Sequence, residues 1–314
     1  MFRGRGCWLP GGSATLRRVF DFRYHVASLA AVFVALVIGI LVGVGLSGQG
    51  FVDDAERRNL NDRIAALQQQ LDEADGRLAA VDRRQRALDD YADATYAALI
   101  PGRLENRRVA VLFVGQRDRL VDRAVGRAVR QAGGVVVRVR ALRVPVEPQA
   151  LQDALRRRPA LEALAAADAL DDVGEELARE LVNGGRAPVW DALARTLVLE
   201  REGVSTAPAD AIVVARSAEP QQGPSRELLA AVYQTLSGLE IPAVGVDHQG
   251  RVPSAVAAFR AAGLSTVDSV DTSAGRLALV LLLAGGPPGS YGVEEEARNG
   301  VLPPVPPLQP SPAP

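Results

Sequence analysis

Very few side chains in this sequence can hold a soft metal ion. The soft ligands of proteins are thiol, thioether and imidazole groups, and the 314-residue chain has one cysteine, one methionine and two histidines. They are Cys7, Met1, His25 and His248. A single cysteine excludes an intrachain disulfide and a multi-cysteine zinc or iron–sulfur site. His248, which follows an apolar run at 243–246, is therefore only a weak metal candidate and is most simply a turn residue.

Two carboxylates in the segment Thr266–Ser273 offer harder ligands. Asp268 and Asp271 lie three residues apart, and carboxylate oxygens bind hard cations such as Ca²⁺. The same segment precedes an apolar helix, whose first turn needs hydrogen-bond acceptors. We therefore favour a capping segment, with Thr272 or Ser273 as the N-cap residue, over a cation site.

The sequence contains no recognisable catalytic or nucleotide-binding motif. The turn Gly115-Gln-Arg-Asp118 after the first apolar strand lacks both the G-x-G-x-x-G and the phosphate-loop patterns. The glycine-rich segment Gly285–Gly289 contains prolines, which have no N–H group to offer a phosphate. We expect a protein that is not an enzyme, with no evident cofactor. The net charge of −1 also predicts no nucleic-acid partner.

The apolar segment Val26–Leu46 predicts a single transmembrane helix, which would anchor the rest of the chain to the membrane. Its 21 residues carry no charge, and they match a hydrocarbon core of about 30 Å. A buried soluble helix is rarely apolar on all faces over this length. A cleaved signal peptide has a shorter apolar region, of about 7–15 residues, and a small-residue cleavage site. No clean site follows the segment, so we expect a retained anchor with the lipid bilayer as its partner.

Charges on the two sides of the anchor predict its orientation. Arginines precede it and an acidic cluster, Asp53–Glu56, follows it. The positive-inside rule then makes residues 1–25 a cytoplasmic arm and places the bulk of the chain outside the cytoplasm. The expected membrane-interface residues are Arg23, Tyr24 and His25.

Residues 52–100 have the pattern of a coiled-coil stalk. Apolar residues alternate spacings of four and three over about four heptads, and charged, Gln and Ala residues lie between them. Gln85 is the polar seam position, and such a residue can fix the register of the helices. We predict homo-oligomerisation through the seam residues Leu60, Ile64, Leu67, Leu71, Leu78, Val81 and Leu88. The alternative is a long helix that packs on its own globular domain.

From residue 106 to 290 the pattern predicts an α/β domain with a mainly parallel sheet. Apolar strands at 108–115 and 135–139 flank a helix at 120–132, which is the order of a βαβ unit. Further strands are expected at 211–215 and 243–246, and further helices at 226–237, 254–262 and 276–284. The segment 147–195 reads as helical. The proline-rich residues 301–314 predict a disordered or extended tail.

The segment Asp21–Gly43, with its R-Y-H-x-x-S-L-A-A-V-F motif, resembles the actinobacterial copper transporter family that is named after the mycobacterial copper transport protein B. The similarity continues through the stalk, returns in Thr266–Leu281 and Gly289–Gly292, and covers about residues 20–302. The resemblance implies an envelope protein that helps to keep intracellular copper low, with copper as a transported or sensed ion. It supplies no catalytic or copper-binding motif.

A single helix cannot enclose a pore, so transport by such a chain needs an oligomer or an envelope protein partner. The alternative function is that of a structural or interaction protein, which presents an α/β domain on a coiled-coil stalk.

The resemblance begins near Phe20, and the segment Met1–Arg18 has no apolar periodicity. Two starts are therefore expected as alternatives: Met1, or a GTG codon at Val19. The later start removes Cys7 and weakens the N-in orientation without reversing it.

Overall fold

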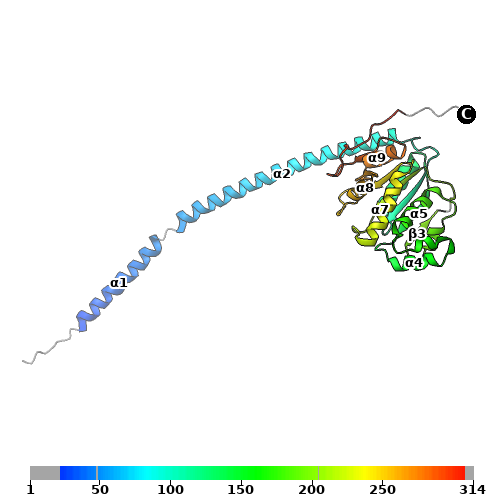
Figure 1. Cartoon of the computed structure of the whole chain (residues 1–314). Coiled ribbons are helices and arrows are strands. Elements are labelled where there is room, and N and C mark those ends of the chain that lie inside the picture. Colours follow the sequence, from blue (N-terminus) through cyan, green and yellow to red (C-terminus); the bar gives the residue numbers. More distant parts are fainter. Residues whose placement is uncertain (1–21, 47–48, 204, 308–314) are drawn as a thin grey trace, which may run out of the picture. The chain divides into compact units, whose positions relative to one another are not determined.

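The computed structural model describes residues 22–46, 49–203 and 205–307 (Figure 1). The chain divides into two compact units between Val81 and Asp82. The predicted N-terminal arm up to residue 21, including Cys7 and the alternative start at Val19, lies outside the described residues. So does the end of the predicted tail, residues 308–314.

Two long helices precede the sheet. α1 (Phe22–Leu46) contains the predicted anchor and begins four residues before it. It is the one helix in the described part of the chain that is long and apolar enough to cross a membrane. α2 (Gln49–Leu99) covers the predicted stalk as one continuous helix of 51 residues. It ends just before Pro101, because a proline disfavours helical geometry in the residue that precedes it.

The α/β unit contains one seven-stranded sheet in the order β3-β2-β1-β4-β5-β6-β7. All neighbouring strands are parallel except β2 and β3, which are antiparallel. The strands are β1 (Arg108–Val114), β2 (Val135–Leu142), β3 (Val198–Glu202), β4 (Ala211–Arg216), β5 (Ala243–Val246), β6 (Ser265–Val267) and β7 (Ser290–Tyr291). The prediction of an α/β domain with a mainly parallel sheet is confirmed. β1 and β4 read as continuous apolar runs because helices cover both faces of the sheet.

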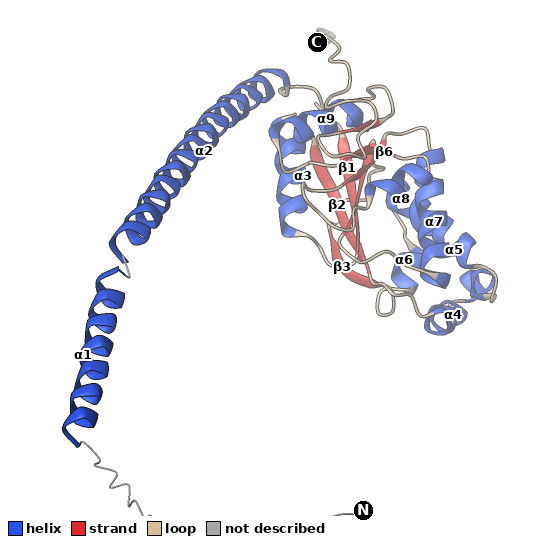
Figure 2. Cartoon of the chain, turned by 90° about the vertical axis from the view of Figure 1, so that its left-hand side faces the viewer, coloured by secondary structure: helices blue, strands red, loops and turns tan. Residues whose placement is uncertain are grey.

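Helices pack on both faces of this sheet. α3 and α9 lie on one face, and α5, α7 and α8 lie on the other (Figure 2). The helices that follow α2 are α3 (Arg119–Gln131), α4 (Pro148–Arg156), the 3₁₀ helix η1 (Pro159–Ala165), α5 (Leu170–Asn183), α6 (Pro188–Ala192), α7 (Gly223–Gly238), α8 (Val256–Ala261) and α9 (Ser273–Leu283). The segment 147–195 contains α4, η1, α5 and α6, in agreement with its helical pattern. The apolar residues of these helices belong to the same core as those of α7.

Each face of the sheet has its own hydrophobic core. One core contains Trp190 and Phe259, and the other contains Phe113 and the apolar face of α9. Gly245 in β5 explains how α8 lies so close to the sheet. A Cβ atom at Gly245 would lie 2.4 Å from Cδ2 of Phe259, so that any larger residue would displace the ring.

The last turns of α2 are part of the α/β unit. Tyr96 and Ile100 are buried in the core on the α3 and α9 side. The Tyr96 hydroxyl donates to Oε1 of Gln131 at 2.7 Å, and the Arg276 guanidinium lies 5.1 Å from the centre of the Tyr96 ring. Core packing, a hydrogen bond and a cation–π contact therefore join the end of α2 to the domain.

Three strands were not predicted, and all three lie toward the edges of the sheet. β3 ends in Glu200, Arg201 and Glu202, which are charged because this edge strand faces water. β6 and β7 contain only three and two residues, which is too short for a periodic pattern. Both edges of the sheet are thus made of short or charged strands.

Candidate functional site at the carboxyl edge of the sheet

The strand order brings three loops together at the carboxyl ends of the central strands. β1 and β4 are neighbours, but the chain continues from β1 to β2 on one side and from β4 to β5 on the other. Open α/β sheets bind ligands outside the carboxyl ends of their strands, at such a switch point. The loops here begin at Gly115, Ser217 and Asp247, immediately after β1, β4 and β5. This edge is therefore where a functional site of the domain is expected.

Asp247 organises the loop after β5. Its side chain is 3% exposed, and its two oxygens accept hydrogen bonds from the backbone N–H groups of His248 and Ala255, each at 2.9 Å. Burial raises the pKa of Asp247, against the opposing effect of these hydrogen bonds. The carboxylate closes the loop from residue 247 to 255 and thereby fixes the position of His248.

His248, Asp118 and Arg251 form a small polar network at this edge. Oδ2 of Asp118 lies 3.9 Å from Nε2 of His248 and 3.5 Å from Nη1 of Arg251. Nδ1 of His248 lies 3.0 Å from the carbonyl oxygen of Gln249. Asp118 is also the N-cap of α3, where its other oxygen, Oδ1, accepts from the N–H groups at the start of the helix. The network therefore ties the loop after β5 to the first turn of α3.

The position of His248 leaves it a poor ligand for a copper ion. One imidazole beside one carboxylate is an incomplete set, and the Arg251 guanidinium next to that carboxylate repels a cation. Over the part of the chain that the structure describes, no group of three or more His, Cys, Asp or Glu side chains is placed to hold a metal ion. The side chains of this network can form hydrogen bonds with a polar ligand, and they hold the loop after β5 against the first turn of α3.

The two carboxylates that were considered as hard-cation ligands both hold loops instead. Asp268 is buried and accepts from the N–H groups of Val293 at 2.9 Å and Glu294 at 3.2 Å. Asp271 accepts from the N–H group of Gln249 at 2.8 Å. These contacts hold the loops that follow β5 and β7 beside the loop after β6.

The N-cap of α9 is one of the two residues predicted for it. Thr272 is the cap, and its Oγ1 accepts from the N–H group of Gly275 at 3.0 Å. The capping prediction for this segment is thus confirmed at Thr272.

The other predicted functional residues lie on α1 and α2. Arg23, Tyr24 and His25 are exposed in the first turn of α1. The seam residues of α2 are 47–63% exposed in the single chain, and they are Leu60, Ile64, Leu67, Leu71, Leu78, Val81 and Leu88. This row is an apolar strip that Gln85 interrupts once, and most of the positions between its members are polar or small.

Sequence reasoning did not identify Arg251, or the role of Asp118, at the carboxyl edge. Asp118 had a usable signal, because an aspartate directly before an amphipathic helix is a typical N-cap. Arg251 had none, since its contact with Asp118 joins positions more than a hundred residues apart.

Comparison with known proteins identifies the family. The family model described as "Copper transport outer membrane protein, MctB" matches residues 19–303. Two relatives, each named "Copper transporter MctB", come from Mycobacterium bovis and Mycobacterium tuberculosis. Each is 25% identical over 321 aligned positions, which cover 90% of this chain and 98% of the relative. With most of its length matched from α1 to β7, this chain belongs to the MctB copper transport outer membrane protein family.

Proposed function

We propose that this protein is a membrane-anchored envelope protein that limits intracellular copper and acts as a homo-oligomer assembled through α2. The family and its relatives, which are named for copper transport, support the link to copper. The apolar helix α1 supports the membrane anchor. Copper is then the transported or sensed ion rather than a resident cofactor.

The observation that carries the oligomer is the exposed seam of α2. Seven large apolar residues remain open to water in the single chain, and together with Ala74 and Gln85 they follow the alternating spacings of three and four of a heptad seam. Packing against a second seam would bury each of them, and a fully buried Leu or Val side chain contributes about 1.5–3 kcal/mol. Knobs-into-holes packing of such a repeat is the usual way in which long amphipathic helices cover an apolar strip.

An oligomer also supplies what one helix lacks. A single α1 cannot surround a path for an ion, because a pore needs several helices around it. Ala35, Gly39 and Gly43 lie four residues apart on α1. Small residues at this spacing allow two membrane helices to approach closely. We infer that copies of α1, or α1 with a partner helix, surround the copper pathway.

The proposed topology places the N-terminus in the cytoplasm and the α/β domain outside it. A reporter enzyme that is active only after export, fused behind Pro314, is expected to be active, because the arginines before Val26 hold that end inside. A matched fusion to a reporter that works only in the cytoplasm is the control. Activity of the cytoplasmic reporter at this position would overturn the topology.

The copper function is tested by deletion and complementation. A deletion strain is expected to be hypersensitive to copper and to contain more copper per cell, as measured by mass spectrometry of washed cells. The wild-type gene and the Gln69→Asp variant should restore tolerance, whereas Leu71→Asp should not. Both variants place an aspartate on α2, but only Leu71 lies on the seam.

The opposite outcome favours the other functional class. Normal copper content and tolerance in the deletion strain, together with a defect in the cell wall or in division, would refute the copper proposal. That result would identify a structural or interaction protein that presents its α/β domain on a stalk.

A further inference from the structure

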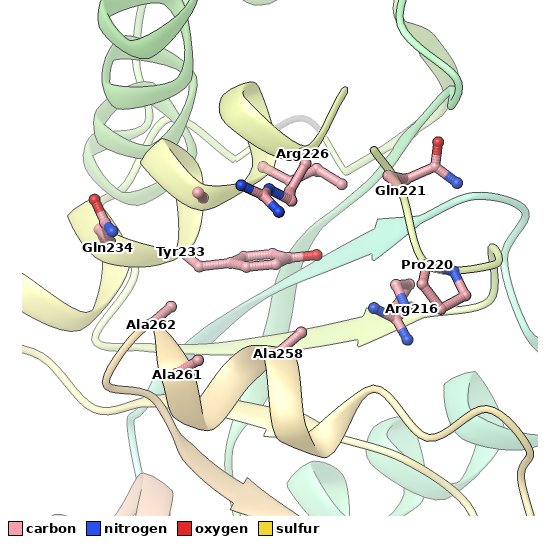
Figure 3. Close-up of a pocket in the computed structure, with 11 residues that line it drawn as sticks. Arg216, Pro220, Gln221, Arg226, Tyr233, Gln234, Ala258, Ala261 and Ala262 are labelled. Carbon is pink, nitrogen blue, oxygen red and sulfur yellow. The ribbon is translucent and has the colours of Figure 1, made fainter. Parts of the chain in front are cut away.

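A cavity of about 390 Å³ lies between α7 and α8, beside the carboxyl end of β4 (Figure 3). Its lining contains two arginines, Arg216 and Arg226, and no acidic residue. The remaining walls are mainly apolar, from residues such as Leu229 on α7 and Ala258 on α8, and the amides of Gln221 and Gln234 also line the cavity. The cavity is thus apolar along its walls and cationic at one end.

Arg216 is the unusual member of this lining. It is the last residue of β4 and is 8% exposed. Its guanidinium donates one hydrogen bond, from Nη2 to the carbonyl oxygen of Ser254 at 3.1 Å, and its Nε is buried without a partner. Among the described residues, no carboxylate lies within ion-pair distance of it. Burial of a cationic group is favourable only where its donors and its charge are matched, so this guanidinium is suited to pairing with an anionic group.

Another buried arginine shows how the same protein satisfies such a group when no ligand is involved. Arg138 in β2 donates to the carbonyl oxygens of four residues, and it does not line the cavity. Its donors are occupied by the fold itself. Arg216 has no such cage of carbonyl groups, although it is buried to a similar extent.

Tyr233 adds a second unpaired polar group at the same end. Its ring lines the cavity and packs edge-on against Phe259, with 5.2 Å between ring centres. Its hydroxyl is buried without a hydrogen-bond partner and points toward the end where Arg216 and Pro220 lie (Figure 3). Burial raises the pKa of Tyr233, so the phenol keeps its proton at neutral pH and remains a donor.

The start of α7 strengthens the positive potential of this end. The helix begins at Gly223 without a side-chain cap and without an acidic residue in its first turn. Its N-terminal partial charge is therefore not neutralised locally. Arg226, in the same first turn, is exposed and faces the cavity above the Tyr233 ring (Figure 3).

We propose that this cavity binds a small organic anion, a carboxylate on a compact apolar body, with the carboxylate held by Arg216 and Arg226. The apolar body lies against the alanines of α8 and the side chain of Leu229. Such a ligand supplies the missing counter-ion and leaves the apolar walls covered. The site is a second binding function, separate from the handling of copper.

The test uses the full chain in lipid nanodiscs and isothermal titration calorimetry with 1-naphthaleneacetate. Empty nanodiscs correct for partition into lipid, and the matched neutral alcohol, 1-naphthaleneethanol, tests the charge. The carboxylate is expected to bind at one site per chain, and the alcohol at least about tenfold more weakly, because a charge-assisted hydrogen bond is lost.

Substitutions of the lining residues test whether the carboxylate binds in this cavity. Arg216→Gln is expected to weaken the carboxylate about tenfold or more, and Ala258→Leu should abolish binding by filling the cavity. Arg226→Gln, at an exposed position, should also weaken binding. It provides the test of the arginine contact if Arg216→Gln disturbs the fold. Arg156→Gln removes an exposed arginine of α4 and should leave the affinity unchanged.

Two results would overturn the proposal. The first is the absence of any carboxylate binding tighter than about 1 mM to the full chain. The second is equal binding of carboxylate and alcohol that neither arginine variant changes, which would make the cavity a non-specific apolar surface.

Discussion

Replacing Leu71 by aspartate is expected to dissociate the proposed oligomer. Leu71 lies in the middle of the seam and is 63% exposed in the single chain. In an assembled coiled coil the substitution removes about 1.5–3 kcal/mol of apolar burial from each chain. It also places like charges next to one another at the interface. Sedimentation equilibrium of the soluble chain from residue 49 onward should show a concentration-dependent oligomer for the wild type and a monomer for Leu71→Asp.

Gln69→Asp is the matched control for this experiment. It introduces the same charge two residues away, at a position opposite the seam, where the native Gln69 side chain donates to Glu73 one turn along. Its oligomeric state should equal that of the wild type. A wild-type chain that stays monomeric at all concentrations, or a Leu71→Asp chain that still assembles, would refute association through α2.

Replacing Tyr96 by alanine is expected to have the largest effect on the stability of the α/β unit among the positions on α2. The ring is 6% exposed and lies in the core that α3 and α9 share. Alanine there leaves a cavity and removes the hydrogen bond to Gln131 and the contact with Arg276. Truncation of a buried aromatic residue to alanine typically destabilises a protein by about 3–5 kcal/mol.

Urea unfolding of the chain from residue 49 onward measures this effect. Trp190 is its single tryptophan and is buried in the core on the other face of the sheet, so its fluorescence reports the whole domain. Tyr91→Ala is the matched control, because Tyr91 lies on the same helix but is 71% exposed. Its free energy of unfolding should change by less than about 0.5 kcal/mol. Equal effects of the two substitutions would mean that the end of α2 does not stabilise the domain.

The central strands could be predicted from the sequence because both faces of a parallel sheet are buried. β1 is apolar from Val109 onward and β5 is apolar throughout, so both strands could be recognised from composition. β3 was missed for the opposite reason. Its residues Glu200 to Glu202 are charged, and its place in the sheet depends on antiparallel pairing with β2, which no local pattern records.

The candidate sites were harder to predict because they depend on contacts between distant segments. The heptad seam is a local repeat, and its residues were found without a structure. The cavity at Arg216 combines a strand end with faces of α7 and α8, which follow at different points of the chain. An arginine after an apolar strand usually marks the point where the strand reaches water, so its burial is visible only in the fold.

The two edges of the sheet have a consequence for the proposed membrane-anchored oligomer. Joining copies through α2 would raise the effective concentration of neighbouring domains, and open strand edges that meet in this way can pair and lead to aggregation. Here one edge is β3, with its run of charges, and the other is β7, with only two residues. Neither edge offers a long apolar template for another strand. In the proposed oligomer the domains could therefore lie close together while each keeps its own sheet.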